Sequence, residues 1–135
     1  MAGASRAKAA RLMSRWLGVG LSLNRIGLTY LLRPARGARA WIGRAAGDPA
    51  TTVIMRGHGA HDLALGCGGR SALARGDERG ARAWIGVQVL ADAAHFASTL
   101  AVRERLPPRG ARFALLVAGV SVVAGSAAAF TLAGR

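Results

Sequence analysis

Seven polar side chains stand within otherwise apolar segments and are the candidates for chemistry in this sequence. They are Arg25, His58, His61, Asp62, Gln88, Asp92 and His95. Positions 88, 92 and 95 are spaced by four and three residues, which places their side chains on one face of a helix. Positions 58, 61 and 62 fall within about one helical turn. In a bilayer each ionisable group costs at least ~2.5 kcal/mol, so we expect these groups to face protein and to have partners.

Three interpretations of this cluster are open. In the first, which we favour, Arg25 forms an ion pair with Asp62 or Asp92 and fixes the register of neighbouring helices. In the second, the two aspartates carry protons or a small solute, while the histidines titrate near neutral pH. In the third, histidine and carboxylate groups on two helices ligate a divalent ion. The spacing matches neither Glu-x-x-His nor His-Glu-x-x-His, so we expect no metal and no cofactor.

Sequence motifs of enzymes are absent. The chain has no Gly-x-Ser-x-Gly, no phosphate-binding loop and no dinucleotide fingerprint. Cys67 is the only cysteine, which excludes an intrachain disulfide and a multi-cysteine zinc site. We therefore expect no catalytic residue and a non-enzymatic protein.

The elements that must position the cluster are helices of membrane-spanning length. Residues 113–134 form a run of 22 residues without a charged side chain. Roughly 20 apolar residues in a helix cross the ~30 Å hydrocarbon core of a bilayer. Residues 83–102 form a second apolar segment, which contains a single acid, Asp92. Both segments predict helices within a membrane.

Breaker residues divide the chain into four expected helices. Arg33-Pro34 ends the first, and Asp48-Pro49 starts the second with an acceptor side chain followed by proline. Gly76-Asp77 precedes the third, and Leu-Pro-Pro at 106–108 precedes the fourth. The expected helices are 12–32, 49–74, 80–102 and 109–133, in a single domain of residues 1–135. The predicted fold is all-α, a four-helix transmembrane bundle with a short interfacial basic segment between helices 1 and 2.

Three tryptophans flank these helices beside arginines. Trp16 follows an arginine directly, and Trp41 and Trp84 each lie two residues after an arginine in the octapeptide RGARAWIG, which occurs twice. Tryptophan prefers the headgroup level of a bilayer, and arginine can extend its guanidinium to the same level. We therefore expect Trp16, Trp41 and Trp84 to be interfacial anchors.

The composition is basic and apolar. Half of the chain is hydrophobic (52%), and the formal net charge is +13. A basic chain first suggests nucleic acid or anionic lipid. The cations are spread through every loop, and a soluble protein would have to bury residues 113–134, so nucleic-acid binding is the weakest alternative. Four spans would place nine cations on each side of the membrane, so the positive-inside rule gives no orientation.

Residues 56–66, with the sequence RGHGAHDLALG, resemble the core motif of a family of small actinobacterial integral-membrane proteins of unknown activity. The family motif is close to R-x-x-G-x-R-D-L-x-L-G. It follows an Asp-Pro helix start like Asp48-Pro49 and precedes an Ala-Asp stretch like Ala91-Asp92 and a Leu-Pro-Pro turn like that at 106–108. The resemblance covers roughly residues 20–130. It implies a four-helix membrane protein and adds no activity.

The chain departs from that motif at two positions. His61 stands where the family usually has arginine, and His95 stands where a second acid is frequent. If the family's arginine and acid pair across helices, the two changes compensate for each other.

We expect a multi-pass protein of the plasma membrane, in contact with lipid and associated with itself or with another membrane protein, without nucleic acid. The favoured function is that of a structural or accessory membrane component. The alternative is a small proton-coupled or small-solute transporter that uses the Asp/His cluster, for which a homo-oligomer would build the path.

Overall fold

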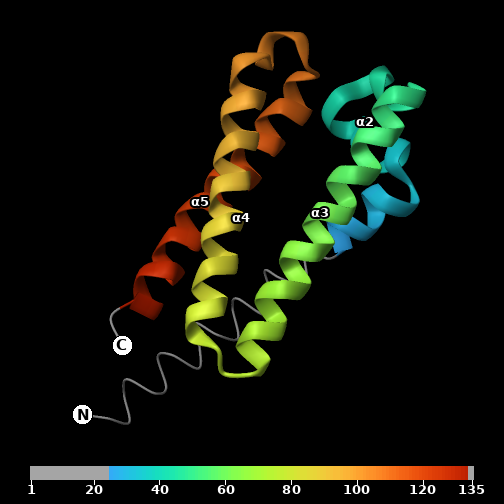
Figure 1. The fold of residues 1–135 in the computed structure, drawn as a ribbon. Helices are drawn as coiled ribbons and strands as arrows, with labels where there is room; N and C mark the ends of the chain where they lie inside the picture. Colours follow the sequence, from blue (N-terminus) through green and yellow to red (C-terminus); the bar gives the residue numbers. More distant parts are fainter. Residues whose placement is uncertain (1–24, 134–135) are drawn as a thin grey trace.

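The computed structural model describes residues 25–133, and within this range the chain is all-helical with no strand, as expected (Figure 1). Residues 25–32 are helical and follow directly on the part of the chain that is not described. The further elements are α2 (Pro34–Ile42), the 3₁₀ turn η1 (Gly43–Gly47), α3 (Pro49–Ala74), α4 (Glu78–Ala101), the 3₁₀ turn η2 (Arg103–Arg105) and α5 (Pro108–Ala133). The three long helices therefore agree with the expected bounds to within two residues at each end.

The starts of α3 and α4 follow from their capping residues. Asp48 Oδ1 accepts hydrogen bonds from the backbone N–H groups of Ala50 at 2.8 Å and Thr51 at 3.3 Å. Pro49 occupies the first helical position, where a missing N–H has no cost. Asp77 caps α4 in the same way, since its Oδ1 accepts from the N–H of Gly80 at 2.8 Å. These side chains satisfy donors that the first helical turn leaves free.

The basic segment between the first two expected helices is itself a short helix, α2, and its position at a membrane interface stays a prediction. Pro34 opens it, and Gly43 ends it with φ of 66°, a conformation that glycine adopts without steric cost. Ala38 is fully buried, whereas Arg36 and Arg39 are exposed. The arginines of this segment therefore lie on the outer face of a packed amphipathic helix.

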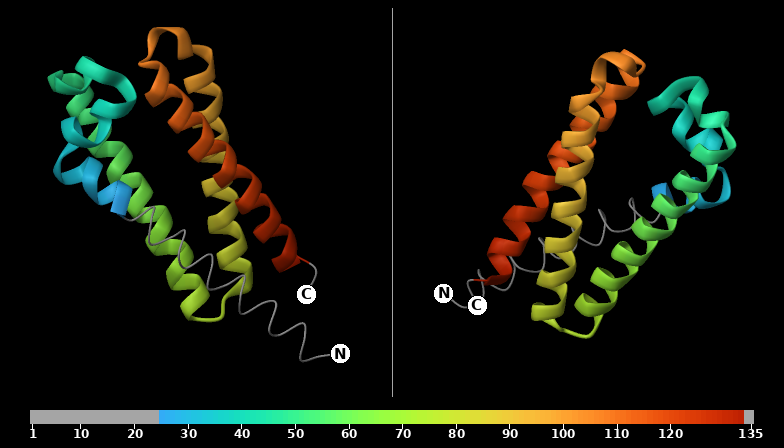
Figure 2. Two further views of the ribbon diagram at one scale, coloured as in Figure 1. Left: turned by 180° about the vertical axis from the view of Figure 1, so that it is seen from behind. Right: turned by 45° about the horizontal axis from the view of Figure 1, so that its top comes forward.

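The helices form two layers (Figures 1 and 2). One layer is the hairpin of α4 and α5, the other contains α2 and α3, and the turn between α3 and α4 joins them. α4 and α5 pack against each other along their length, and α3 contacts α4 near the turn that joins them. The axes of α3 and α4 diverge away from that turn (Figure 2). α2 contacts both α3 and α5, so it bridges the two layers at their open end.

Small side chains make up most of the interior. Seven of the ten buried apolar residues in the described range are alanine, and the other three are Met55, Leu65 and Ile85. Large apolar side chains are instead found outside, among them Leu90 (71% exposed), Val123 (70%) and Phe130 (81%). Asp62, Gln88 and Thr99 are buried. The described part of the chain thus has small and polar residues inside and large apolar residues outside.

One helix of the described residues is long and apolar enough to cross a membrane. It is Pro108–Leu132, with a mean hydropathy of 2.1 over its most apolar window. Only 22% of that window is buried, so the other described helices do not cover α5 as a globular domain covers its core helix. α3 and α4 do not meet the same criterion, so a bundle of four spans is not established by helix length and hydropathy.

Candidate functional site

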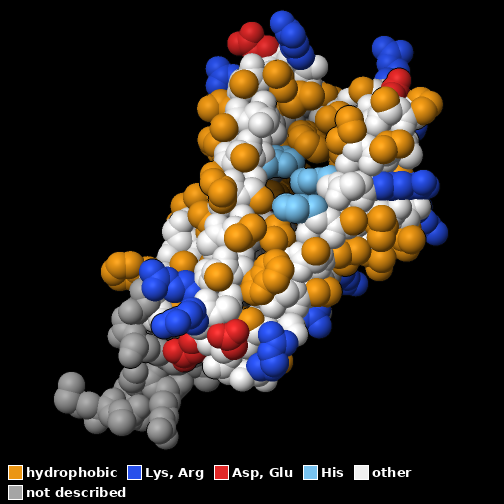
Figure 3. All heavy atoms as spheres, viewed as in Figure 1, with side chains coloured by type: hydrophobic (Ala, Val, Ile, Leu, Met, Phe, Trp, Pro, Cys, Tyr) orange, Lys and Arg blue, Asp and Glu red, His pale blue; other side chains and the backbone are white. Residues whose placement is uncertain are grey.

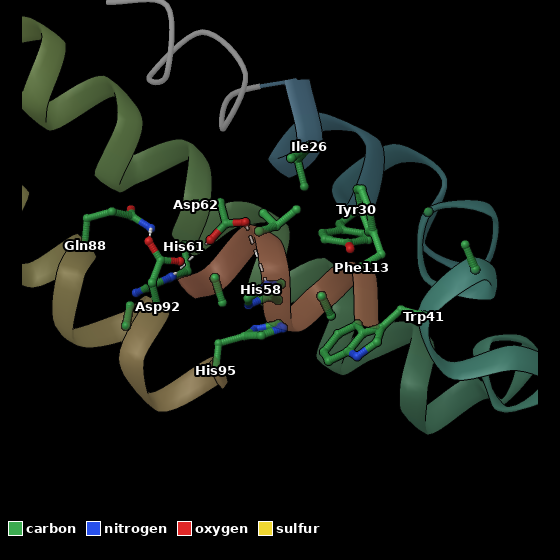
Figure 4. A pocket seen from close by; sticks show the side chains of 16 residues that line it. Ile26, Tyr30, Trp41, His58, His61, Asp62, Gln88, Asp92, His95 and Phe113 are labelled. Atoms are coloured by element: carbon green, nitrogen blue, oxygen red, sulfur yellow. Dashed lines mark hydrogen bonds and ion pairs between the residues drawn. The ribbon is translucent and has the colours of Figure 1, made fainter. Parts of the chain in front are cut away.

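A pocket of about 130 Å³ lies where the two helical layers diverge. Figure 3 shows histidine side chains in the hollow between α3 and the α4–α5 hairpin. The pocket is lined by side chains from every described helix, and Figure 4 labels ten of them. Such a volume holds a few water molecules or a small ion or solute, and it is well below the ~300 Å³ of pockets that bind drug-sized ligands.

Asp62 lies at the centre of the polar side of the pocket, between two histidines of the same helix (Figure 4). Its Oδ2 is 3.7 Å from His58 Nε2, and its Oδ1 is 3.5 Å from His61 Nδ1. The Asp62 side chain is only 10% exposed, whereas that of His61 is 49% exposed. Both separations exceed the 2.7–3.2 Å of ordinary N–H···O hydrogen bonds. The three groups therefore surround a shared space and do not form two tight ion pairs.

α4 contributes Gln88, Asp92 and His95, each about one turn after the previous one. Gln88 Nε2 donates to Asp92 Oδ2 at 3.0 Å, while Gln88 Oε1 is buried without a hydrogen-bond partner. The ring of His95 stacks on Trp41 with centroids 4.6 Å apart and lies 5.6 Å from the ring of His58. The helical spacing that suggested one polar face in the sequence does bring these three side chains to one side of the pocket (Figure 4).

A close crossing of two helices at glycines places Asp62 deep in the protein. A Cβ on Gly27 would lie 2.8 Å from the Gly59 carbonyl oxygen and 3.1 Å from Asp62 Cβ. A Cβ on Gly59 would lie 2.5 Å from the Gly27 carbonyl oxygen. Helix 25–32 can thus approach α3 only because both residues lack a side chain. This crossing positions Tyr30 beside His58, with ring centroids 5.6 Å apart.

Six of the seven candidate residues line this pocket, and Arg25 does not. The expected pairing of Arg25 with Asp62 or Asp92 is wrong. Among residues 25–133, the groups in ion-pair range of Asp62 are His58 and His61, and Arg25 is exposed at the start of the described chain. Arg25 lies two residues before Gly27, which makes the contact with α3, so helical geometry places Arg25 on the far side of this helix from α3.

The tryptophans have different environments. Trp41 lines the pocket, and its Nε1 is buried without a hydrogen-bond partner. The indole points into the protein because α2 turns its apolar face inward, and the interfacial position of Trp41 stays a prediction. Trp84 is 38% exposed and lies against Gly68 of α3, and Trp16 lies outside the described residues.

Three aromatic residues also line the pocket, and the sequence does not predict this role for them. They are Tyr30, Trp41 and Phe113. Each belongs to a different helix, and each lies on the apolar side of the cavity (Figure 4). No spacing rule within a single segment relates them to the histidines, since they meet only through the packing of helix 25–32 and α2 on α3 and of α5 on α2 and α4. Comparisons with protein-family models, curated proteins and solved structures find no match to this chain.

Proposed function

We propose that the protein is a multi-pass integral membrane protein of the plasma membrane, and that α3, α4 and α5 are spans. We further propose that its polar pocket serves a non-enzymatic role, the passage or binding of a small cationic solute or of protons. The main support for the proposal is that burial is reversed relative to a water-soluble protein. Large apolar side chains lie outside, and polar side chains lie inside.

In water this distribution of side chains is unfavourable. Each exposed valine, leucine or phenylalanine forgoes about 1.5–3 kcal/mol of hydrophobic stabilisation, whereas in a bilayer the same side chains contact lipid. Large apolar side chains are exposed on α3, α4 and α5, so the apolar outer surface belongs to all three long helices. Packing through glycine and alanine is typical of helices in membranes, where close backbone approach stabilises association.

The positions of the charged residues in α4 and α5 are compatible with membrane-spanning helices. α4 has one acid and no cation between Arg82 and Arg103, and that acid, Asp92, lines the pocket. α5 has no charged residue from Phe113 to the end of the described range. α3 has 13 residues between Arg56 and Arg70, about 20 Å of helix, so both guanidinium groups must extend toward the headgroups.

A solute or proton path explains the pocket better than a purely structural network does. Asp62 is not neutralised by the arginine that a register-fixing ion pair would use, and three histidines line the same cavity. Ionisable groups at membrane depth mark ion and proton pathways when they face a cavity. Because one chain of 135 residues encloses only a small pocket, we expect a homo-oligomer to complete the path.

Membrane fractionation followed by a flux measurement tests the proposal. Carbonate-washed membranes should retain the protein, and detergent should release it. In proteoliposomes, Asp92→Asn should abolish proton- or cation-dependent flux while leaving the helical content unchanged, with Glu104→Gln, an exposed carboxylate outside the pocket, as the matched control. Release by carbonate would contradict membrane integration, and equal flux in Asp92→Asn and wild type would contradict the role of the pocket.

A further inference from the structure

The geometry points to a binding site for one divalent transition-metal ion, of the Zn²⁺ class, formed by His58, His61 and Asp62 on α3. This inference deepens the proposed function by naming the class of cation that the pocket takes. The ligand atoms of the three residues lie within 4.8 Å of one another. No other group of three or more histidine, cysteine or acidic residues in the described range has that arrangement.

The ligand atoms lie somewhat farther apart than tetrahedral coordination requires, and side-chain rotation can close the difference. Zinc–nitrogen and zinc–oxygen bonds of about 2.0–2.2 Å at tetrahedral angles place neighbouring ligand atoms roughly 3.4 Å apart. The two histidines approach different oxygens of the Asp62 carboxylate, at 3.5 Å for His61 Nδ1 to Oδ1 and 3.7 Å for His58 Nε2 to Oδ2, and one of these oxygens would serve as the ligand. One donor atom from each of the three residues lies within 4.8 Å of the other two, so an ion could be bound after the side chains close these separations by up to about 1.4 Å. If the side chains were hydrogen-bonded to one another, they would have to move apart before an ion could enter. The distances from Asp62 to His58 and to His61 already exceed hydrogen-bond length.

A single helix holds all three ligands on a rigid scaffold. Residues three and four apart lie on one helix face, so the backbone of α3 fixes the positions of residues 58, 61 and 62. Residue 58 is followed by Gly59, which packs directly on helix 25–32 and anchors this turn of α3. The spacing His-x-x-His-Asp is not one of the common zinc motifs, and the site is recognised from the atom positions.

The donor set selects the class of metal. Two imidazoles and one carboxylate suit Zn²⁺, Co²⁺, Ni²⁺ or Cu²⁺, whereas Ca²⁺ and Mg²⁺ prefer oxygen ligands. Three protein ligands leave one position of a tetrahedral ion free. The pocket extends from the ligands toward His95, whose ring lies 5.6 Å from that of His58 (Figure 4). Water or His95 can complete the coordination, and an exchangeable fourth ligand is what a transported ion requires.

Metal titration of the full-length protein in detergent tests the inference. The protein is purified without a histidine tag and titrated with Co²⁺, whose visible absorption reports tetrahedral coordination, and Zn²⁺ is then added as competitor. We expect one Co²⁺ per chain, displaced by Zn²⁺. His61→Ala should weaken binding by more than about 100-fold, since loss of an outer-shell partner alone costs 10–100-fold.

His61 is the variant of choice because its half-exposed side chain can be removed without disturbing the core. Cys67→Ser tests the exposed thiol as an alternative ligand, and Glu104→Gln is a carboxylate control outside the site. Both should bind Co²⁺ like wild type. The inference is overturned if wild type binds no Co²⁺ or Zn²⁺, if His61→Ala binds like wild type, or if Cys67→Ser abolishes binding.

The two proposals fail independently. Absence of metal binding together with carbonate resistance and Asp92-dependent flux would overturn the metal site alone and leave a proton or another solute as the cargo. Metal binding that depends on His61, in a protein released by carbonate, would overturn membrane integration and retain the metal site.

Discussion

Replacing Gly59 by alanine tests the helix crossing that positions the pocket. A Cβ at this position would lie 2.5 Å from the Gly27 carbonyl oxygen, 2.7 Å from the Leu31 backbone nitrogen and 3.0 Å from Tyr30 Cβ. Two of these three neighbours are backbone atoms of a helix, which cannot move aside as a flexible side chain does. Relief to an ordinary contact of 3.4 Å or more requires helix 25–32 and α3 to separate by close to 1 Å at this crossing.

Overpacking of this kind costs about 1–3 kcal/mol. Gly57 provides a matched control on the same helix, because a Cβ at Gly57 meets no atom within 4 Å. Alanine is favoured over glycine in a helix interior by about 0.8–1 kcal/mol, so Gly57→Ala should stabilise the protein slightly. The same intrinsic gain applies to Gly59→Ala, where the collision offsets it. The two variants should therefore differ in the free energy of unfolding by at least about 1 kcal/mol, with Gly57→Ala the more stable.

Thermal unfolding in detergent, followed by circular dichroism, measures this difference. Near-equal midpoints for Gly59→Ala and Gly57→Ala would refute the close crossing of helix 25–32 and α3. Metal affinity gives a second readout, because the crossing anchors the turn of α3 between His58 and His61. Gly59→Ala should weaken Co²⁺ binding, and Gly57→Ala should leave it unchanged.

Two further substitutions test the caps and the orientation of side chains. Asp48→Ala removes the acceptor for the first N–H groups of α3 and should cost about 1 kcal/mol in the free energy of unfolding, whereas Asp48→Asn retains an acceptor and should cost less. Ile85→Ala truncates a buried side chain and should destabilise by about 2–5 kcal/mol, whereas Leu90→Ala, on the exposed face of the same helix, should change stability by less than about 0.5 kcal/mol. Chemical denaturation in detergent measures both pairs, and a cost for Leu90→Ala that equals that of Ile85→Ala would contradict the observed orientation of α4.

Local rules account for the elements that could be predicted from the sequence. The Asp48-Pro49 pair marks the start of α3 because the side chain and the proline ring both act within one helical turn. The gathering of Gln88, Asp92 and His95 follows from helical periodicity alone. These features need no knowledge of the rest of the fold.

Tertiary packing determines the features that local sequence patterns do not indicate. Opposite charge alone pairs Arg25 with Asp62, but the direction of the Arg25 side chain depends on how helix 25–32 rotates onto Gly59. The arginines beside Trp41 do not indicate its contact with His95, because that contact depends on how α2 packs on α5. Contacts between residues far apart in the sequence set both outcomes, and hydropathy within one segment does not encode them.

Cysteine labelling in native membranes tests most directly the claim that the outer surface of the bundle faces lipid. In a Cys67→Ser background, Val120→Cys places a thiol at the centre of α5 on a side chain that is 65% exposed in the structure. Glu104→Cys places one in the η2 turn. Membrane fragments open on both sides are treated with a water-soluble maleimide. The account predicts rapid labelling at position 104 and none at position 120 until the membrane is dissolved in denaturing detergent. Equal labelling of both positions in intact membranes would show that α5 faces water and would contradict the account.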